Sequence, residues 1–223
     1  MTEPLDNPIW HALIGPHASL SFGDDDLRWY PPAIGIFVAA PNAETFDRAL
    51  PNWDGTLAIT MVAEPLLVPH GWRKVFHEDY LQMTCTAAVA SSHRSPTIGA
   101  LGTDDVAEMV ALTAMTKPGP FFERTIELGP YVGVRDEGRL VAMAGIRLAF
   151  DGHTEVSAVC THPEYQGEGF AQALVHHLAS SIVARGETAF LQVAQTNLAG
   201  IRAYAAVGFQ PNGAIAAQAF ARE

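Results

Sequence analysis

The chain has 223 residues, a net charge of −11 and 48% apolar residues, a composition typical of a globular protein and unlike that of a disordered one. Its only lysines are Lys74 and Lys117, and it has no basic run. Because a phosphate backbone is bound by clustered Lys and Arg, nucleic acid is excluded as an expected partner. No apolar run approaches the roughly 18 residues of a membrane helix, and the acidic start does not resemble a signal peptide. We therefore expect a cytoplasmic protein with no membrane partner.

The pattern of the sequence changes near residues 91–96, where Ser, His, Arg and Pro follow one another. We predict a domain boundary there, with an N-terminal α/β domain of unknown role over residues 1–90 and a second domain over residues 91–223. The first part carries 11 acidic and 4 basic residues, a net charge of −7, so it is the more acidic of the two.

Within the first part, short apolar runs at 33–40 and 57–62 are bounded by Pro, Asn, Asp and Gly, which indicates buried strands. The segments 46–50 and 77–83 are expected to be helical. No motif in this part points to a chemical activity.

The second part has a regular order of predicted elements. Turn residues and apolar periodicity predict helix, three antiparallel strands, helix, strand, helix and strand. The expected ranges are 103–117 (helix), 131–135, 140–150 and 155–161 (strands), 169–185 (helix), 188–193 (strand), 197–207 (helix) and 214–220 (strand).

The segment with the most chemical information follows the strand at 155–161. Gly167 and Gly169 lie in a turn that opens the next helix. Glycines allow a tight turn and a close approach of the backbone, and the free N–H groups of a helix start attract anions. The turn therefore suits a pyrophosphate without any lysine.

Two other nucleotide sites are excluded by the same residues. A Walker loop needs Gly-x-x-x-x-Gly-Lys-Ser/Thr, which the sequence lacks. A dinucleotide fingerprint needs a third glycine and a parallel sheet, whereas the turn here follows predicted antiparallel hairpins. An NAD-dependent oxidoreductase is therefore disfavoured.

What remains is Gln-x-x-Gly-x-Ala at Gln166, Gly169 and Ala171, with Pro163 upstream. A second motif places Asn197 before Tyr204 and then Gly-Phe at 208–209. On these motifs, residues 97–223 resemble the GNAT superfamily of acyl-CoA N-acyltransferases. A longer N-terminal part before such a domain is similar to the glycine N-acyltransferase-like branch.

The resemblance implies an α/β fold with a central mixed, mostly antiparallel sheet flanked by helices, preceded by a smaller α/β domain. It also implies acetyl-CoA as co-substrate, with the pantetheine pairing to strand backbone and the pyrophosphate on the glycine turn. The cofactor-binding residues implied are Val159, Thr161, Gln166, Gly167, Glu168, Gly169, Phe170, Ala171 and Asn197. Asn197 is equally well explained as the cap of its helix.

Direct attack of an amine on a thioester needs a base for the amine and an acid for the leaving thiolate. The resemblance makes Glu155 the candidate base and Tyr204 the candidate acid. Glu155 could instead be a solvated carboxylate at a strand end, and Tyr204 a core residue. Strand alternation would place Glu155, Ser157, Val159 and Thr161 on one side, and the orientation of that side decides the role of Glu155.

Other residues carry weaker signals. Cys160 is expected to be a buried thiol rather than an acyl-carrying nucleophile. The resemblance places the acceptor pocket beside Phe121, Phe122 and Arg124, which a packed aromatic loop would explain as well. No His, Cys or acidic cluster has ligand spacing, so no metal is expected.

The predicted function is transfer of an acetyl or acyl group from acetyl-CoA to a small-molecule or peptide amine. The alternative is an acyl-CoA-binding sensor or interaction module with little turnover. If the acidic N-terminal part faces the acceptor, cationic amines should be preferred. A homodimer is included among the expected partners.

Overall fold

The structure is a computed structural model that describes residues 3–89 and 96–223. The helices in these residues are α1 (Pro8–Ile14), α2 (Ala43–Ala49), α3 (Val106–Thr116), α4 (Phe170–Ala184) and α5 (Leu198–Val207). The strands are β1 (Phe22–Gly23), β2 (Arg28–Trp29), β3 (Val38–Ala39), β4 (Leu57–Val62), β5 (Trp72–Cys85), β6 (Ile98–Leu101), β7 (Tyr131–Asp136), β8 (Arg139–Phe150), β9 (His153–Thr161), β10 (Thr188–Ala194) and β11 (Gln210–Arg222). None of these helices is long and apolar enough to cross a membrane.

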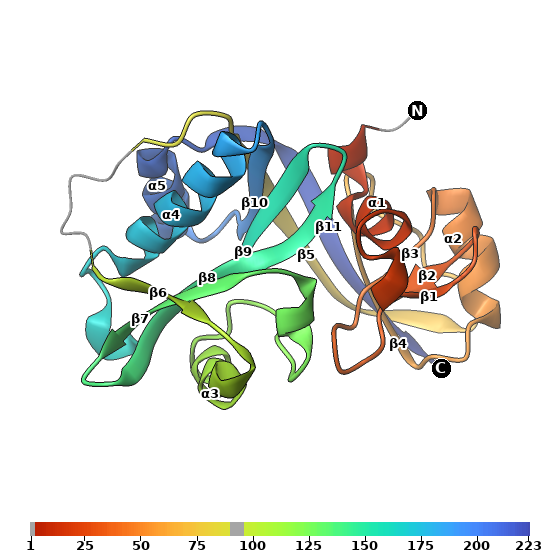
Figure 1. Ribbon diagram of the computed structural model, residues 1–223. Helices are drawn as coiled ribbons and strands as arrows, with labels where there is room; N and C mark the ends of the chain where they lie inside the picture. Colours follow the sequence, from red (N-terminus) through yellow and green to blue (C-terminus); the bar gives the residue numbers. More distant parts are fainter. Residues whose placement is uncertain (1–2, 90–95) are drawn as a thin grey trace.

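The fold is organised around one eight-stranded sheet with the order β4-β11-β5-β10-β9-β8-β7-β6 (Figure 1). Among the described strands of this sheet only the pair β9 and β10 is parallel, while the other neighbouring strands run antiparallel. A small three-stranded sheet, β1-β2-β3, belongs to the N-terminal part. The expected mixed, mostly antiparallel sheet flanked by helices is confirmed.

Most of the expected elements of the second part are present, and β4 spans the predicted range 57–62. The prediction of a helix at 77–83 is wrong, because these residues lie inside β5. This strand pairs with β10 on one side and with β11 on the other. Backbone pairing on both sides overrides the local sequence pattern, which lacks a clear alternation of apolar and polar residues.

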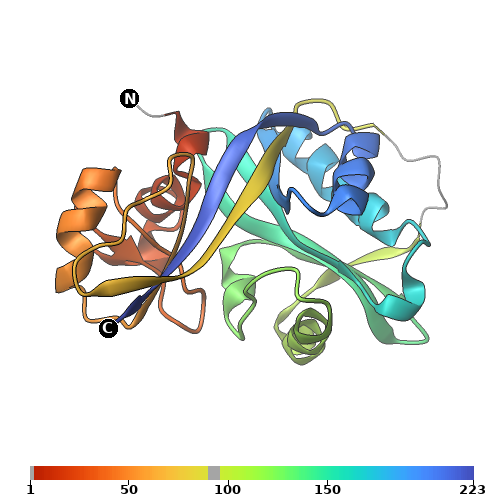
Figure 2. The same ribbon diagram turned by 180° about the vertical axis from the view of Figure 1, so that it is seen from behind.

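The boundary predicted at 91–96 falls largely on residues 90–95, which lie outside the described residues. Strands β4 and β5 from the first 85 residues nevertheless belong to the same sheet as β6 to β11. Figure 2 shows β5 and β11 running side by side from the helices α4 and α5 to the N-terminal elements. The N-terminal part thus builds part of the central sheet, and the two-domain division stays a prediction.

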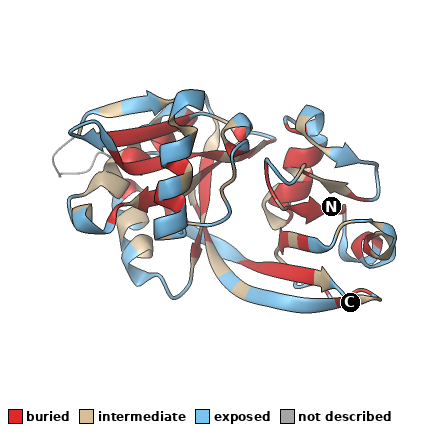
Figure 3. Ribbon diagram, turned by 90° about the horizontal axis from the view of Figure 1, so that it is seen from below, coloured by how far each residue is buried: buried red, intermediate tan, exposed pale blue. Residues whose placement is uncertain are grey.

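Both faces of the sheet are covered by helices. On one face, α4 packs Leu174 and Leu178 against strand residues such as Val141. On the other face, α3 packs Met109 against Leu140. Adjacent residues of β8 thus enter different cores, as the alternation of a strand requires. Figure 3 shows the buried residues along the inner surfaces of these helices and strands.

Helix α1 extends the second layer toward the N-terminal part. Its residues Ile9 and Leu13 pack with Phe150 of β8 and Phe190 of β10. A fourth cluster joins Phe46 of α2 to β4 and β11. The N-terminal elements therefore pack against the edge of the sheet that is formed by β4 and its neighbour β11.

Candidate functional site

The site begins where two parallel strands separate. The register of β9 and β10 runs from Thr188 opposite His153 to Phe190 opposite Glu155. Beyond this point β9 continues to Thr161 and β10 to Ala194. The strands therefore open toward their C-terminal ends, as the expected coenzyme cleft requires.

A β-bulge shapes the β9 side of this opening. Ala158 and Val159 together lie opposite Ala144 of β8, and Ala158 has a positive φ of 52°. A bulge leaves a backbone group outside the ladder and turns the side chains that follow it. The expected alternation from Glu155 to Thr161 is therefore wrong, since the bulge interrupts it after Ser157.

A cavity of about 470 Å³ fills the opening and extends toward the N-terminal strands. It is lined by residues from β4, β5, β8, β9, β10, β11 and α5, and by the turn at 118–120. The polar or titratable residues in the lining are Glu78, Tyr80, Arg147, Ser157, Gln192 and Tyr204. The structure thus brings the predicted Tyr204 and Val159 into one cavity with residues from the N-terminal part.

Glu155 lies beside this cavity in a buried ion pair. Its carboxylate accepts hydrogen bonds from Nε of Arg147 at 2.8 Å and from its Nη2 at 2.6 Å. The side chain of Glu155 is only 1% exposed. The alternative of a solvated carboxylate is wrong, and both carboxylate oxygens are occupied by the guanidinium. Glu155 therefore orients Arg147, whose guanidinium also lies 5.1 Å from the ring centroid of Phe37.

Strand β5 supplies the carboxylate that does line the cavity. Glu78 and Tyr80 alternate along β5 toward this side. Burial and the neighbouring Glu78 carboxylate raise the pKa of Tyr80 to about 12. The sequence analysis missed both residues because 77–83 was expected to be a helix. A strand assignment there would have placed Glu78 and Tyr80 on one face.

Tyr204 enters the cavity from α5. Burial raises the pKa of its hydroxyl to about 12, and the nearby Cys160 contributes in the same direction. The hydroxyl is therefore protonated at neutral pH, as a proton donor must be. The ring of Tyr204 also packs edge to face on Phe209. Tyr204 therefore both lines the cavity and contacts the core, so neither of the two interpretations is excluded.

Orphaned polar atoms mark the opening between β9 and β10. Both amide atoms of Gln192 are buried without a hydrogen-bond partner among the described residues, and so is Oγ1 of Thr161. A buried polar group without a partner is costly, and a ligand with its own amide or carbonyl groups would relieve that cost. Gln192 also lines the cavity, and the sequence analysis did not name it.

The glycine turn lies at the start of α4, as predicted. Gly167 and Gly169 both have positive φ, 88° and 79°, a conformation in which a side chain would be strained. The first backbone hydrogen bond of the helix runs from Ala173 to Gly169, so the amides of Phe170 and Ala171 precede the intrahelical ladder. Gln166, Gly167 and Glu168 are exposed, and a phosphate can reach them.

Several candidate residues have structural roles. Asn197 caps α5 by accepting a hydrogen bond from the Gly200 amide at 2.9 Å. Cys160 is buried, and burial raises the pKa of its thiol to about 11, which opposes a nucleophilic role. Among the described residues no cluster of His, Cys, Asp or Glu could hold a metal ion.

The acceptor residues expected after the Pro-Gly-Pro turn do not line the cavity. Phe121 packs edge to face on Tyr131, and Arg124 forms an ion pair with Glu127 at 2.6 Å. Phe122 donates its backbone N–H to Thr125. The cavity instead contacts the preceding turn at 118–120. These three residues support the loop that carries the turn.

Comparison with known proteins identifies the family. Residues 131–216 match the family model of FR47-like proteins. A solved structure from Novosphingobium aromaticivorans DSM 12444, described as an acetyltransferase of the GNAT family, is 37% identical and superimposes with a TM-score of 0.91 over 100% of both chains.

A GCN5-related N-acetyltransferase from Kribbella flavida is 18% identical and shares the fold, with a TM-score of 0.64 over 96% of this chain and 94% of that one. None of the curated proteins compared with the sequence matches it. The identity and full coverage of the Novosphingobium protein, together with the splayed strands and the glycine turn, show that the chain belongs to the GNAT family and is an acyltransferase.

Proposed function

We propose that the protein is an N-acetyltransferase that transfers the acyl group of acetyl-CoA to a primary amine. The observation that carries this proposal is the cavity that joins the bulged β9, the unpartnered Gln192 and the Tyr204 hydroxyl to Glu78. A thioester in the opening between the strands would have an acid on one side and a carboxylate on the other.

The coenzyme would bind mainly through backbone groups. The pyrophosphate suits the exposed glycine turn at 166–171 and the first amides of α4. The pantetheine amides suit the backbone of Val159 and Thr161 and the side chain of Gln192. The N–H that the bulge releases from the ladder is suited to the thioester oxygen, where negative charge develops during attack.

The acceptor amine would enter between β9 and the N-terminal strands. Arg147 is neutralised by Glu155, so Glu78 is the charged lining residue without an ion-pair partner among the described residues. Its carboxylate would attract an ammonium group and accept its proton, directly or through a water. We therefore assign the base to Glu78, and we assign to Glu155 the positioning of Arg147.

The transfer balances without any further reactant. The ammonium group gives one proton to Glu78, which passes it to solvent, and the neutral amine then attacks the thioester carbonyl carbon, forming a C–N bond. The C–S bond then breaks, and the leaving thiolate takes the proton of the Tyr204 hydroxyl. The second proton leaves the nitrogen through Glu78 and solvent and restores the Tyr204 hydroxyl. The products are an amide and free coenzyme A.

Binding and turnover are tested separately. Calorimetry with coenzyme A measures binding, and thiol release from acetyl-CoA measures transfer to n-butylamine, to an alanine-starting peptide and to glycine. We expect coenzyme A to bind and cationic amines to be acylated faster than glycine, because Glu78 and the acidic N-terminal part repel a carboxylate. Glycine tests the glycine N-acyltransferase-like branch directly.

Each outcome has a distinct meaning. A protein that does not bind coenzyme A would refute the assignment of the glycine turn. Binding without thiol release from any amine would favour the alternative of an acyl-CoA sensor. The expected cytoplasmic location and homodimer stay predictions.

A further inference from the structure

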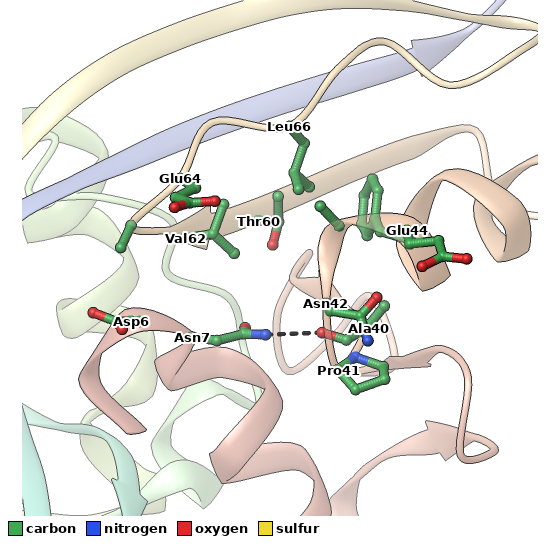
Figure 4. Close-up of a pocket in the computed structure, with 13 residues that line it drawn as sticks. Asp6, Asn7, Ala40, Pro41, Asn42, Glu44, Thr60, Val62, Glu64 and Leu66 are labelled. Carbon is green, nitrogen blue, oxygen red and sulfur yellow. Dashed lines mark hydrogen bonds between the residues drawn. The ribbon is translucent and has the colours of Figure 1, made fainter. Parts of the chain in front are cut away.

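A second cavity, of about 430 Å³, lies in the N-terminal part of the molecule (Figure 4). It is enclosed by the start of α1, the segment 40–46 and strand β4. Strand β4 separates it from the cavity described above. Ile59 and Met61 line the first cavity, while Thr60 and Val62 line the second. This alternation makes the two cavities distinct sites on opposite faces of one strand.

Two buried polar atoms in this cavity have no partner among the described residues. They are Oδ1 of Asn7 and Oγ1 of Thr60, in residues that are only 6% and 1% exposed. Both residues line the cavity, and Figure 4 shows their side chains projecting from opposite walls into the space between α1 and β4. Since native proteins pair almost all such groups, these two indicate a missing polar ligand.

The walls that hold these atoms are tied together by hydrogen bonds. Asn7 donates its Nδ2 to the carbonyl of Ala40 at 2.8 Å, which leaves its Oδ1 as the acceptor facing the cavity. The Ala63 amide donates to the carbonyl of Asp6 at 2.8 Å. The buried Gln218 side chain bonds both the N–H and the C=O of Leu66. The cavity is therefore built into the fold.

The charge of the lining selects the ligand. Asp6, Glu44 and Glu64 contribute carboxylates, and no Lys, Arg or His is among the lining residues of the described chain. Figure 4 shows Asp6 and Glu64 at one end and Glu44 at the other. The remaining lining is largely apolar, with Phe46 and Leu66 among its members. Hydrogen-bond acceptors and carboxylates beside an apolar surface suit a ligand that combines a positive charge with an alkyl chain.

From these observations we infer that the second cavity is a binding site for a small alkylammonium compound. The ammonium group donates hydrogen bonds to Asn7 Oδ1 and Thr60 Oγ1, and the carboxylates of Asp6 and Glu64 balance its charge. The alkyl chain lies against Phe46 and Leu66. This site is separate from the acceptor site proposed above and does not depend on it.

The test is a titration of the full chain with n-butylammonium chloride, in which the shifts of the backbone amide signals are measured by NMR. Because the amine can also enter the first cavity, the titration is repeated in Glu78→Gln, which weakens that site. Thr60→Val and Glu64→Gln remove the hydroxyl and one carboxylate of the second cavity, and Thr60→Val preserves the side-chain shape. Asp54→Asn is the matched control, since Asp54 is an exposed acid of the same part outside the lining. Sodium butyrate and n-butanol serve as control ligands, because they have the same alkyl chain without the positive charge.

We expect saturable shifts at Asn7, Thr60 and Ala63 that persist in Glu78→Gln and Asp54→Asn. Thr60→Val and Glu64→Gln should each weaken binding roughly fivefold, the effect of one lost hydrogen bond or charge contact. Butyrate and butanol should cause no saturable shift at these amides. Shifts confined to the first cavity, or an affinity unchanged by both variants, would overturn the inference. A failed acylation assay would leave this result unaffected.

Discussion

The two walls of the first cavity are built in different ways. The donor wall comprises residues 156–159 of β9, the opening beside β10 and Tyr204 of α5, and outside the cavity it continues to the glycine turn at 166–171. Its β9 and turn residues lie close together in the sequence. The acceptor wall comprises alternating residues of β4, β5 and β11, which come from both ends of the chain. The donor wall offers backbone groups, whereas the acceptor wall offers side chains such as Glu78.

This difference has a physical reason. A phosphate and a thioester oxygen can be held by backbone N–H groups, which any sequence supplies once glycines and a bulge set the conformation. A particular amine needs particular side chains at particular positions on strands. Substitutions on the acceptor wall should therefore have the sharper effects on catalysis.

The largest effect is expected for Glu78→Gln. Removing the proposed base should lower kcat/KM for n-butylamine by about 10³-fold, within the usual range for a general base. Steady-state thiol release measures this loss, and coenzyme A affinity should stay unchanged because Glu78 belongs to the acceptor wall. Asp79→Asn is the matched control, since Asp79 is the next residue of β5 and is exposed. Equal activity of Glu78→Gln and Asp79→Asn would exclude Glu78 as the base.

A second effect separates positioning from proton transfer. Glu155→Gln leaves the buried Arg147 unpaired and should lower the free energy of unfolding by about 3 kcal/mol, measured in urea. Adding Arg147→Met should restore much of that loss, because no buried charge then remains. If Glu155→Gln keeps its stability and loses activity, Glu155 is the base that the sequence analysis named.

Tyr204→Phe addresses the donor wall. Without the hydroxyl the leaving thiolate lacks its acid, and kcat should fall by about 10² while coenzyme A binding is retained. Tyr165→Phe is the control, because the Tyr165 hydroxyl bonds the exposed Asp136 at 2.6 Å. Full activity in Tyr204→Phe would assign Tyr204 to the core alone.

The smallest expected effect is on stability at alkaline pH. The pKa of each of the chain's 5 tyrosines is raised, in Tyr204 to about 12 mainly by burial. An acid whose pKa is raised in the folded state stabilises the fold below the unfolded pKa of about 10, and this contribution is lost as the pH rises toward the folded value.

The free energy of unfolding should therefore be lower at pH 11 than at pH 10 by at least about 1 kcal/mol, which is the contribution of one such tyrosine. Absorbance at 295 nm should show little tyrosinate in the folded protein at pH 10. A stability that is constant over this interval would contradict the assigned burial of these side chains.

The sequence predicted the glycine turn and the helices beside the donor wall. Gly167 and Gly169 determine the turn through conformations that other residues rarely adopt, and apolar periodicity determines α4 and α5. The family resemblance then followed from Gln166 and Tyr204 in the expected elements. These features depend on residues close together in the chain.

The acceptor wall could not be predicted in this way. The 77–83 segment becomes a strand only through pairing with β10 and β11, and both of these partners lie more than a hundred residues away. Glu155 has its buried role only because of Arg147, placed opposite it by a bulge in β8. Neither the strand pairing nor this ion pair can be recognised from a local pattern in the sequence.

By itself, then, the sequence determined the glycine turn and the helix order, because backbone conformation and helix periodicity are local properties. The class of reaction followed from the resemblance of its motifs to those of a known family. Only the tertiary structure decided which carboxylate lines the first cavity and that a second cavity lies behind β4. The face that a strand residue occupies depends on register and bulges, and these arise from pairing between distant segments.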